Sequence, residues 1–301
     1  MIAKVLDGRP VSRALRERAR DELRRFSNAY DFTPGLAVLL VGSDPSARAY
    51  LNAILKAAAS VGMTSAVVEL DATVEQSRLT DAVEALNCQS DVQGFLVLQP
   101  LPPHLSRVAV ADLVDPLKDI DGITTFNAGR LFHDDRDVLA PSTPSGGMAL
   151  LKHYEIPIAG QYAVVIGRSP VVGRPMAAML TAANATVTTC HSRTRDIERY
   201  TRVADILVSA VGKPSVVTGD MVKPGATVID FGVNFVDGRM VGDVDASSVE
   251  RVAGALTPVP GGTGRVTPSI LLRNTIKAAT IQVQRLTASA GVADLGLMGD
   301  L

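Results

Sequence analysis

One stretch of the sequence, residues 161–194, has the residue types and spacing of a phosphate-binding turn. A β-branched run ends in Gly167-Arg168-Ser169, and Gly173 begins a helical segment rich in Ala, Met and Leu. Glycines let the backbone approach a phosphate, and the N–H groups at a helix start can bind it. The chemistry predicted here is dinucleotide binding. The spacing of Gly167 and Gly173 does not fit G-x-G-x-x-G, so an ordinary strand-to-helix turn stays open.

The segment that follows the second strand of this stretch lacks an acidic residue. A site selective for NAD usually has Asp or Glu there to hold the ribose hydroxyls. This chain has His191-Ser192-Arg193 instead. A hydroxyl and a guanidinium suit a 2′-phosphate, and Arg168 supplies a second cation. The segment therefore favours NADP over NAD, with a solvated surface role for Arg193 as the alternative.

Strands and helices alternate along the chain, which predicts an α/β fold with parallel sheets. Residues 112–144 have mostly turn chemistry, so we place a domain boundary near Pro141. Residues 287–301 are rich in Ala and Gly with few anchors, and we predict a disordered tail. The predicted strands cover residues 2–6, 36–41, 66–70, 94–98, 163–166, 186–189, 205–211 and 227–233, and the predicted helices include 47–61, 75–86 and 267–286.

Composition excludes several classes of protein. The chain has 301 residues, enough for two domains, with a net charge of −1 and 4% aromatic residues. Neither a nucleic-acid partner nor an electrostatic membrane patch is indicated. Cys88 and Cys190 stand alone, so we expect a reduced cytoplasmic protein without a metal site. No stretch approaches the roughly 18 apolar residues that a membrane helix needs.

Several motifs, in one order, resemble the methylenetetrahydrofolate dehydrogenase/cyclohydrolase family. They are VGSDPSARAYL and KDIDG in the first half, and GRSPVVGRP, CHSRT, SAVGKP, VIDFGVN, GDVD and TPVPGG in the second. The resemblance implies a homodimer that binds NADP and tetrahydrofolate derivatives, with a folate cleft between two α/β domains. It makes residues 1–140 a folate-binding catalytic domain, completed by the helix 267–286, and residues 141–266 a Rossmann-like NADP-binding domain.

The resemblance also assigns roles to single residues. Tyr50 matches the tyrosine that packs against the folate, and Asp121 matches the acid that holds the pterin ring. Both are predicted catalytic residues, although by chemistry alone Tyr50 could be core and Asp121 a cap. The predicted substrate-binding residues are Tyr50, Leu98, Asp121, Pro260, Gly261 and Gly262. The predicted cofactor-binding residues are Gly167, Arg168, Ser169, Gly173, His191, Ser192, Arg193 and Val233.

Two catalytic positions of the family are changed. Ile54 stands at the position of its catalytic lysine, and Leu98 at that of the glutamine that supports the lysine. Lys56 lies two residues along the helix, about 200° away, and is predicted to be solvated. Gln99 should point away from the side of Leu98, because side chains alternate along a strand. A β-bulge could bring Gln99 back.

The family's two reactions depend on these positions differently. Hydride loss from an N–CH₂–N carbon is driven by the nitrogen lone pair, so cofactor placement carries most of that step. Hydrolysis of the methenyl product needs an acid–base group, which typically contributes about 10²–10⁴ in rate. We predict an NADP-dependent methylenetetrahydrofolate dehydrogenase of one-carbon metabolism with a weak or lost cyclohydrolase.

Three alternatives stay open. The first is a fully bifunctional enzyme with a relocated base, such as Asp121 or a water. The second is a paralogue that acts on a different folate-like substrate, and the third is a catalytically silent subunit that binds NADP or folate. The substrate half departs from the family pattern at further positions, namely Ile123, Thr124, Thr125, Ser142, Thr263 and Arg265.

Overall fold

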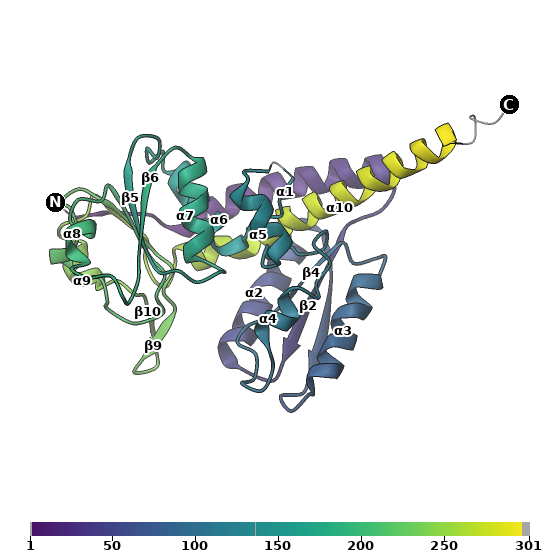
Figure 1. Ribbon diagram of the computed structural model, residues 1–301, viewed down its shortest axis with the longest axis horizontal. Helices are drawn as coiled ribbons and strands as arrows, with labels where there is room; N and C mark the ends of the chain where they lie inside the picture. Colours follow the sequence, from purple (N-terminus) through teal and green to yellow (C-terminus); the bar gives the residue numbers. More distant parts are fainter. Residues whose placement is uncertain (1, 136, 297–301) are drawn as a thin grey trace. The chain divides into compact units, whose positions relative to one another are not determined.

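The computed structural model describes residues 2–135 and 137–296, and it divides into two compact units (Figure 1). Unit 1 consists of Met1–Leu15, Ala128–Asp135 and Pro141–Ile270. Unit 2 consists of Arg16–Asn127, Arg136–Ala140 and Leu271–Leu301.

Unit 1 contains a six-stranded sheet in which all neighbouring strands are parallel. Ala163 and Val165 of its strand β5 pack into one hydrophobic cluster, and Val164 and Ile166 pack into another. Both faces of the sheet are therefore covered, as parallel sheets require. In spatial order the strands are β1 (Lys4–Val5), β11 (Ala255–Leu256), β8 (Thr227–Asp230), β7 (Ile206–Ser209), β5 (Tyr162–Ile166) and β6 (Thr186–Cys190).

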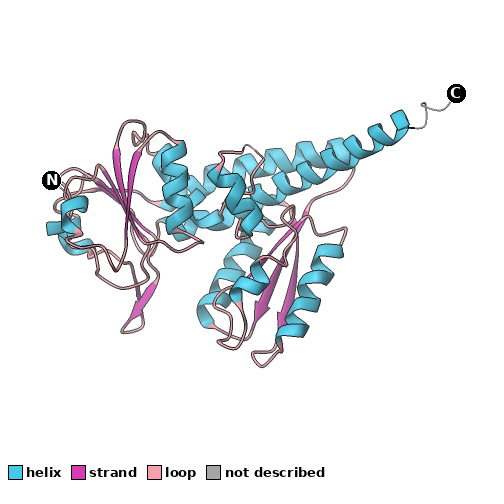
Figure 2. Ribbon diagram, viewed as in Figure 1, coloured by secondary structure: helices cyan, strands magenta, loops and turns pink. Residues whose placement is uncertain are grey.

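Short helices and one hairpin complete unit 1 (Figure 2). The hairpin pairs β9 (Asn234–Val236) with β10 (Arg239–Val241) in antiparallel fashion. The helices are α6 (Ser142–His153), α7 (Gly173–Ala182), α8 (Glu198–Thr201), α9 (Ala246–Val249) and the 3₁₀ turn η1 (Gly219–Met221).

Unit 2 contains a three-stranded parallel sheet, in the order β3 (Thr64–Leu70), β2 (Gly35–Val41), β4 (Gly94–Val97). Every residue of β2 is buried, because its two faces pack into two different hydrophobic clusters. The helices are α2 (Pro45–Val61), α3 (Gln76–Cys88) and α4 (Arg107–Ala111). The Asp44 carboxylate accepts the N–H groups of Ser46 and Ala47 and so fixes where α2 begins.

Three helices have residues in both units: α1 (Gly8–Tyr30), α5 (Thr125–Phe132) and α10 (Thr263–Gly296). The helix α5 lies in the region predicted to be mostly turns, and that expectation is wrong for these residues. Asp112 accepts both the N–H and the hydroxyl of Thr125 at 2.8 Å, which stabilises the start of the helix. The acceptor is distant in sequence, so local pattern did not reveal the helix.

The extent of the units differs from the predicted domains. The predicted first strand, β1, pairs with β11, so the first residues of the chain belong to unit 1 rather than to the domain predicted for residues 1–140. The helix α10 continues past its predicted end at Leu286 to Gly296. Residues 297–301 of the predicted tail lie outside the described residues. The assignment of folate and NADP to separate domains stays a prediction.

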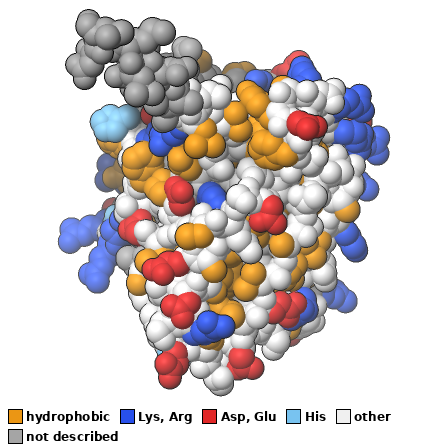
Figure 3. Space-filling model, turned by 90° about the vertical axis from the view of Figure 1, so that its right-hand side faces the viewer, with side chains coloured by type: hydrophobic (Ala, Val, Ile, Leu, Met, Phe, Trp, Pro, Cys, Tyr) orange, Lys and Arg blue, Asp and Glu red, His pale blue; other side chains and the backbone are white. Residues whose placement is uncertain are grey.

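The surface carries charges of both signs. On the face drawn in Figure 3, Lys and Arg side chains lie among Asp and Glu side chains. Within the described part of the chain, no helix is both long and apolar enough to span a bilayer.

Candidate active site

The predicted phosphate-binding turn joins β5 to α7, and its two glycines are required by close backbone contacts. Gly167 has φ +128°, and a Cβ there would collide with the carbonyl oxygen of Ala210. A Cβ on Gly173 would collide with the carbonyl of Gly167. The N–H of Gly167 donates to the carbonyl of Cys190 at 2.9 Å, which ties the turn to the end of β6. Only glycine fits both positions without a backbone shift.

Ser169 orders the start of α7 from within this turn. Its hydroxyl oxygen accepts the N–H groups of Val172 at 3.2 Å and Gly173 at 3.3 Å. Arg168 is exposed beside it. The turn therefore combines an ordered helix N-terminus with an exposed cation, and such an arrangement can hold a pyrophosphate.

The sheet order places this turn at a switch point. The next two strands along the chain, β6 and β7, lie on opposite sides of β5, so the strand order reverses at β5. Ligands of open parallel sheets bind at the carboxyl ends of the strands at such a point. The glycine turn, the residues after Cys190 and the loop after Ser209 all stand there.

The residues after β6 form a tight turn. The N–H of Thr194 donates to the carbonyl of His191 at 2.8 Å, and Ser192 and Arg193 are exposed between them. The structure thus presents the hydroxyl and the guanidinium that the sequence assigned to a 2′-phosphate.

A buried carboxylate, Asp243, holds the loop after β7. It accepts the N–H groups of Val211, Gly212 and Lys213 at 2.7, 3.1 and 3.0 Å. It also accepts the side-chain amide of Asn234 at 3.0 Å. These hydrogen bonds offset the cost of burying the carboxylate.

A second buried carboxylate, Asp230, lies beside it at the end of β8. Asp230 accepts the N–H groups of Gly232 at 2.7 Å and of Asp243 at 3.0 Å. Burial raises the pKa of Asp230 to about 6, although these backbone hydrogen bonds act to lower it. Val233, a predicted cofactor residue, is 56% exposed and stands between Gly232 and Asn234, which the two carboxylates hold.

The loop with Pro260, Gly261 and Gly262 connects β11 to α10. The N–H of Gly8 donates to the carbonyl of Gly261 at 2.8 Å, and a Cβ on Gly8 would collide with the carbonyl of Gly262. Thr263, one of the departures from the family pattern, donates its hydroxyl to the carbonyl of Asp230 at 3.1 Å. The amino-terminal segment and the end of β8 thus fix this loop within unit 1.

In unit 2, the predicted helix positions of Tyr50 and Ile54 are correct. Ile54 is 0% exposed in a hydrophobic cluster, and Tyr50 is partly buried against the same cluster. Asn52 and Lys56 are exposed on the other side of α2. The prediction that Lys56 is a solvated cation is confirmed, so it does not stand at the position of Ile54.

Leu98 follows β4 and belongs to the same cluster as Ile54, with 2% of its surface exposed. Its N–H donates to the carbonyl of Leu39 at 2.9 Å, so the pairing with β2 continues through this residue. Gln99 is exposed. The alternation along the strand therefore holds, and no bulge turns Gln99 towards the side of Leu98.

The loop with Asp121 is held from both sides. Asp119, 1% exposed, accepts the N–H groups of Ile123 at 3.0 Å and of Thr124 at 2.9 Å. Asn274 of α10 donates to the carbonyl of Ile120 at 2.7 Å. Asp121 itself is partly exposed between these anchors.

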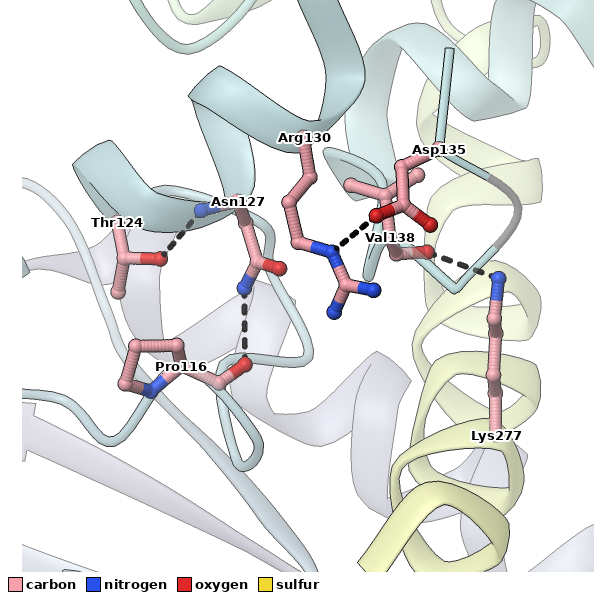
Figure 4. Close-up of polar contacts among 7 residues, drawn as sticks. All are labelled: Pro116, Thr124, Asn127, Arg130, Asp135, Val138 and Lys277. Atoms are coloured by element: carbon pink, nitrogen blue, oxygen red, sulfur yellow. Dashed lines mark hydrogen bonds and ion pairs between the residues drawn. The ribbon is translucent and has the colours of Figure 1, made fainter. Parts of the chain in front are cut away.

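Figure 4 shows how the residues after this loop are fixed. Asn127 donates its amide to the carbonyl of Pro116 at 2.9 Å, and its N–H donates to the hydroxyl of Thr124 at 3.2 Å. In the same unit, Lys277 of α10 donates to the carbonyl of Val138 at 2.9 Å. The backbone on both sides of Asp121 is thereby anchored by side chains.

Sequence reasoning missed the residues that hold these loops, chiefly Asp119, Asp230 and Asp243. All three are buried, whereas an exposed acid is the usual interpretation of an Asp in a turn or at the end of a strand. The only available signal was the position of Asp230 and Asp119 beside buried apolar residues.

Cysteine and histidine do not form a metal-binding group. Cys88 is exposed and Cys190 is buried, and both are free thiols. Between residues 2 and 296, leaving out residue 136, no cluster of three or more His, Cys, Asp and Glu side chains could hold a metal ion.

Two family models match the chain. Residues 6–121 match the tetrahydrofolate dehydrogenase/cyclohydrolase catalytic domain, and residues 141–283 match the NAD(P)-binding domain of the same family. The dinucleotide turn lies in the second match, and Tyr50, Ile54 and Leu98 lie in the first.

Individual proteins are similar over nearly the whole chain. The bifunctional protein FolD of Roseiflexus sp. (strain RS-1) is 47% identical over 94% of this chain and 98% of its own length. The crystal structure of the bifunctional enzyme FolD from Campylobacter jejuni has a TM-score of 0.89 and 39% identity, covering 93% of this chain and 99% of that chain. The Trypanosoma brucei methylenetetrahydrofolate dehydrogenase-cyclohydrolase, complexed with NADP cofactor and inhibitor, has a TM-score of 0.89 and 37% identity, covering 94% and 99%.

These similarities confirm the family, the two-domain α/β fold and the dehydrogenase class that the sequence motifs predicted. The predicted use of a nicotinamide dinucleotide agrees with the NAD(P)-binding domain of the second match. This chain belongs to the tetrahydrofolate dehydrogenase/cyclohydrolase family.

Proposed function

We propose that this protein is an NADP-dependent 5,10-methylenetetrahydrofolate dehydrogenase of one-carbon metabolism whose cyclohydrolase activity is weak or lost. One observation carries the second half of this proposal. Ile54 and Leu98, at the positions that the resemblance gives to a catalytic lysine and its supporting glutamine, are both buried in one hydrophobic cluster.

The residues of unit 1 fit NADP. Gly167 and Gly173 have no side chain that could stand between the backbone and a pyrophosphate at the start of α7. Ser192 and Arg193 would hold the 2′-phosphate, with Arg168 as a further cation. When bound, NADP accepts the hydride that leaves the substrate. We include Val233 among the cofactor-binding residues because it is exposed just after β8, at the carboxyl end of a strand of the same sheet.

The residues of unit 2 have the chemistry to bind and orient a folate. The partly buried ring of Tyr50 offers a face for stacking against the pterin or the aminobenzoate. The Asp121 carboxylate can accept paired N–H bonds from the aminopyrimidine edge. The anchors at Asp119 and Asn274 keep the backbone around Asp121 in one conformation. Such pre-ordering reduces the entropy that substrate binding must overcome.

The oxidation itself requires little acid–base catalysis by the protein. The methylene carbon lies between two nitrogens, and a nitrogen lone pair forms the new C=N bond as the hydride leaves. The product is a delocalised methenyl cation, and no proton is transferred. Placement of the two reactants is therefore the main contribution of the chain.

Hydrolysis of the methenyl cation is different, because water must lose a proton and a ring nitrogen must gain one. Ile54 and Leu98 have no group that can carry a proton, and Lys56 and Gln99 are exposed on other sides. Loss of a positioned acid–base group typically costs about 10²–10⁴ in rate. This difference supports a dehydrogenase that releases its product unhydrolysed.

Direct supply of methenyltetrahydrofolate tests the proposed loss. The rate of its disappearance with the protein should stay close to the uncatalysed rate, while a bifunctional family member assayed in parallel accelerates it. An acceleration equal to that of the bifunctional enzyme would replace the proposal by a fully bifunctional enzyme with a relocated base.

We also propose a homodimer and a cytoplasmic location. The family resemblance supports the dimer, and the two free thiols support a reducing compartment. Light scattering of the purified chain should give twice the monomer mass, and fractionation of the source cells should place the protein with cytoplasmic markers. A monomer mass or recovery with envelope markers would contradict these two statements.

A further inference from the structure

Thr194 closes the turn after β6 through two hydrogen bonds to His191. The hydroxyl oxygen of Thr194 accepts the N–H of His191 at 2.9 Å, and the N–H of Thr194 donates to the carbonyl of His191 at 2.8 Å. In addition, Nδ1 of His191 accepts the N–H of Arg193 at 3.2 Å. Three groups of His191 therefore form hydrogen bonds within residues 191–194, namely its backbone N–H, its backbone carbonyl and one ring nitrogen.

The same threonine joins the turn to the core of unit 1. The turn that it closes follows directly on Cys190, the last residue of β6, which is 0% exposed. The carbonyl of Cys190 accepts the N–H of Gly167 at 2.9 Å. Through Cys190, the turn after β6 is connected to the glycine turn after β5.

The tip of the turn carries the two groups proposed for the 2′-phosphate. Ser192 and Arg193 are exposed, and both lie between the two residues that Thr194 connects. A change in the closing bonds would move the Cα positions of both residues. An arginine can offer paired N–H donors to a phosphate only when its stem starts from a suitable position.

We propose that Thr194 is a positioning residue that sets the preference of this protein for NADP over NAD. The inference rests on the proposed binding of NADP and goes beyond it, because it gives Thr194 an indirect role through the positions of Ser192 and Arg193. Its hydroxyl holds the turn in the one conformation that presents Ser192 and Arg193 together. NAD lacks the 2′-phosphate, so its affinity does not depend on this conformation.

Removal of the hydroxyl oxygen isolates this effect. Thr194→Val keeps the shape of the side chain but leaves the N–H of His191 without its acceptor, whereas Thr194→Ser keeps the acceptor. Loss of a partner for such a donor is costly, so the turn relaxes to other conformations. Thr186→Val is the matched control, because Thr186 is exposed at the opposite end of the same strand.

The experiment is isothermal titration of the full chain with NADP⁺ and, separately, with NAD⁺. The expected result is that Thr194→Val weakens NADP⁺ binding by roughly tenfold and leaves NAD⁺ binding unchanged, so the ratio of the two dissociation constants falls roughly tenfold. Thr194→Ser and Thr186→Val should keep the wild-type ratio. Equal weakening for both dinucleotides, or an unchanged ratio, would overturn the inference and leave Thr194 a structural residue.

A double-mutant cycle with Arg193→Gln separates positioning from stability. If Thr194 acts through Arg193, then Thr194→Val should cost little NADP⁺ affinity in the Arg193→Gln background. Full additivity would overturn the inference. If Thr194→Val does not fold, the prediction rests on Thr194→Ser, and loss of the NADP⁺ preference in that variant contradicts it. A wild-type chain that binds NAD⁺ and NADP⁺ equally would instead overturn the NADP assignment itself.

Discussion

Ile54 on α2 and Leu98 at the end of β4 belong to one hydrophobic cluster, with 0% and 2% of their surfaces exposed. In a family member that hydrolyses methenyltetrahydrofolate, the resemblance places a lysine and a glutamine at these two positions. A charged side chain at the position of Ile54 would need a polar partner to offset its burial. The two changes are therefore physically coupled, since either one alone would leave an unpaired polar group in an apolar setting.

Restoring the pair should restore the second reaction. We expect Ile54→Lys with Leu98→Gln to raise the cyclohydrolase rate at least about tenfold, because a positioned acid–base group returns. NADP⁺ affinity should not change, since the nucleotide residues are on other elements. Ala53→Lys adds the same charge on the exposed side of α2 and should give no gain. No gain in the double variant would mean that the changes at Ile123, Thr124 and Thr125 matter more for the cyclohydrolase reaction than those at Ile54 and Leu98.

The single change Ile54→Lys tests the burial of this position. We expect it to lower the free energy of unfolding by about 3–5 kcal/mol, the usual cost of an unpaired buried charge. Denaturant unfolding of this variant, of Ala53→Lys and of the wild type measures the difference. A cost below that of Ala53→Lys would mean that the side chain at residue 54 reaches water.

Asp230 should make stability depend on pH in an unusual direction. Its folded-state pKa is raised from 3.8 to about 6 by burial, so the folded chain binds a proton more tightly than the unfolded chain. The stabilising contribution is complete below pH 3.8 and is lost as the pH rises to about 6. The loss amounts to about 3 kcal/mol, because each pKa unit of difference between the folded and unfolded chain corresponds to about 1.4 kcal/mol.

Urea unfolding at several pH values checks this contribution. Relative to Asp230→Asn, the wild type should lose stability as the pH rises from 4 to about 6. Asp71 provides a control of opposite sign, because hydrogen bonds from Thr73 lower its pKa. The difference between wild type and Asp71→Asn should grow as the pH rises through the acid range. A flat difference for Asp230→Asn would show that its carboxyl is not protonated in this range.

Gly173→Ala should weaken dinucleotide binding. A Cβ at this position collides with the carbonyl of Gly167, so the turn between β5 and α7 must open. Overpacking of this kind costs about 1–3 kcal/mol, which corresponds to roughly 5- to 150-fold in the dissociation constant of NADP⁺ when the cost falls on binding. Gly129→Ala is the control, since a Cβ there meets no atom within 4 Å. Titration with NADP⁺ compares the two, and equal affinities would contradict the proposed role of the turn.

Asn274→Leu should loosen the Asp121 loop. The amide of Asn274 donates to the carbonyls of Ile120 at 2.7 Å and Ala140 at 2.9 Å, and leucine leaves both without this donor. We expect a loss of about 1–3 kcal/mol in unfolding free energy and a higher KM for the folate. Gln284→Leu on the exposed side of the same helix should change neither. An unchanged KM would mean that the loop does not position the substrate.

Much of the fold was predictable because strands and helices alternate with clear periods. The apolar run at residues 36–41 predicted the strand β2, and the helical pattern of residues 47–61 predicted the helix α2. Both expectations are correct. They depend only on local periodicity, which the sequence carries directly.

The unpredicted features depend on contacts between distant residues. The pairing of β1 with β11 joins residues 4–5 to residues 255–256, and nothing in residues 2–6 identifies that partner. The start of α5 depends on Asp112, and the loop after β7 depends on Asp243. Acids that hold distant backbone groups look the same in sequence as other acids, so their roles required the structure.

The most direct test of the proposed function follows both reactions in one sample. Purified protein is mixed with methylenetetrahydrofolate and NADP⁺, and reduced nicotinamide and the methenyl product are measured separately. We expect NADPH to form while the methenyl product accumulates and decays only at its uncatalysed rate. Formation of NADPH without accumulation would contradict the loss of cyclohydrolase activity, and absence of NADPH would contradict the dehydrogenase and favour a different folate-like substrate or a silent subunit.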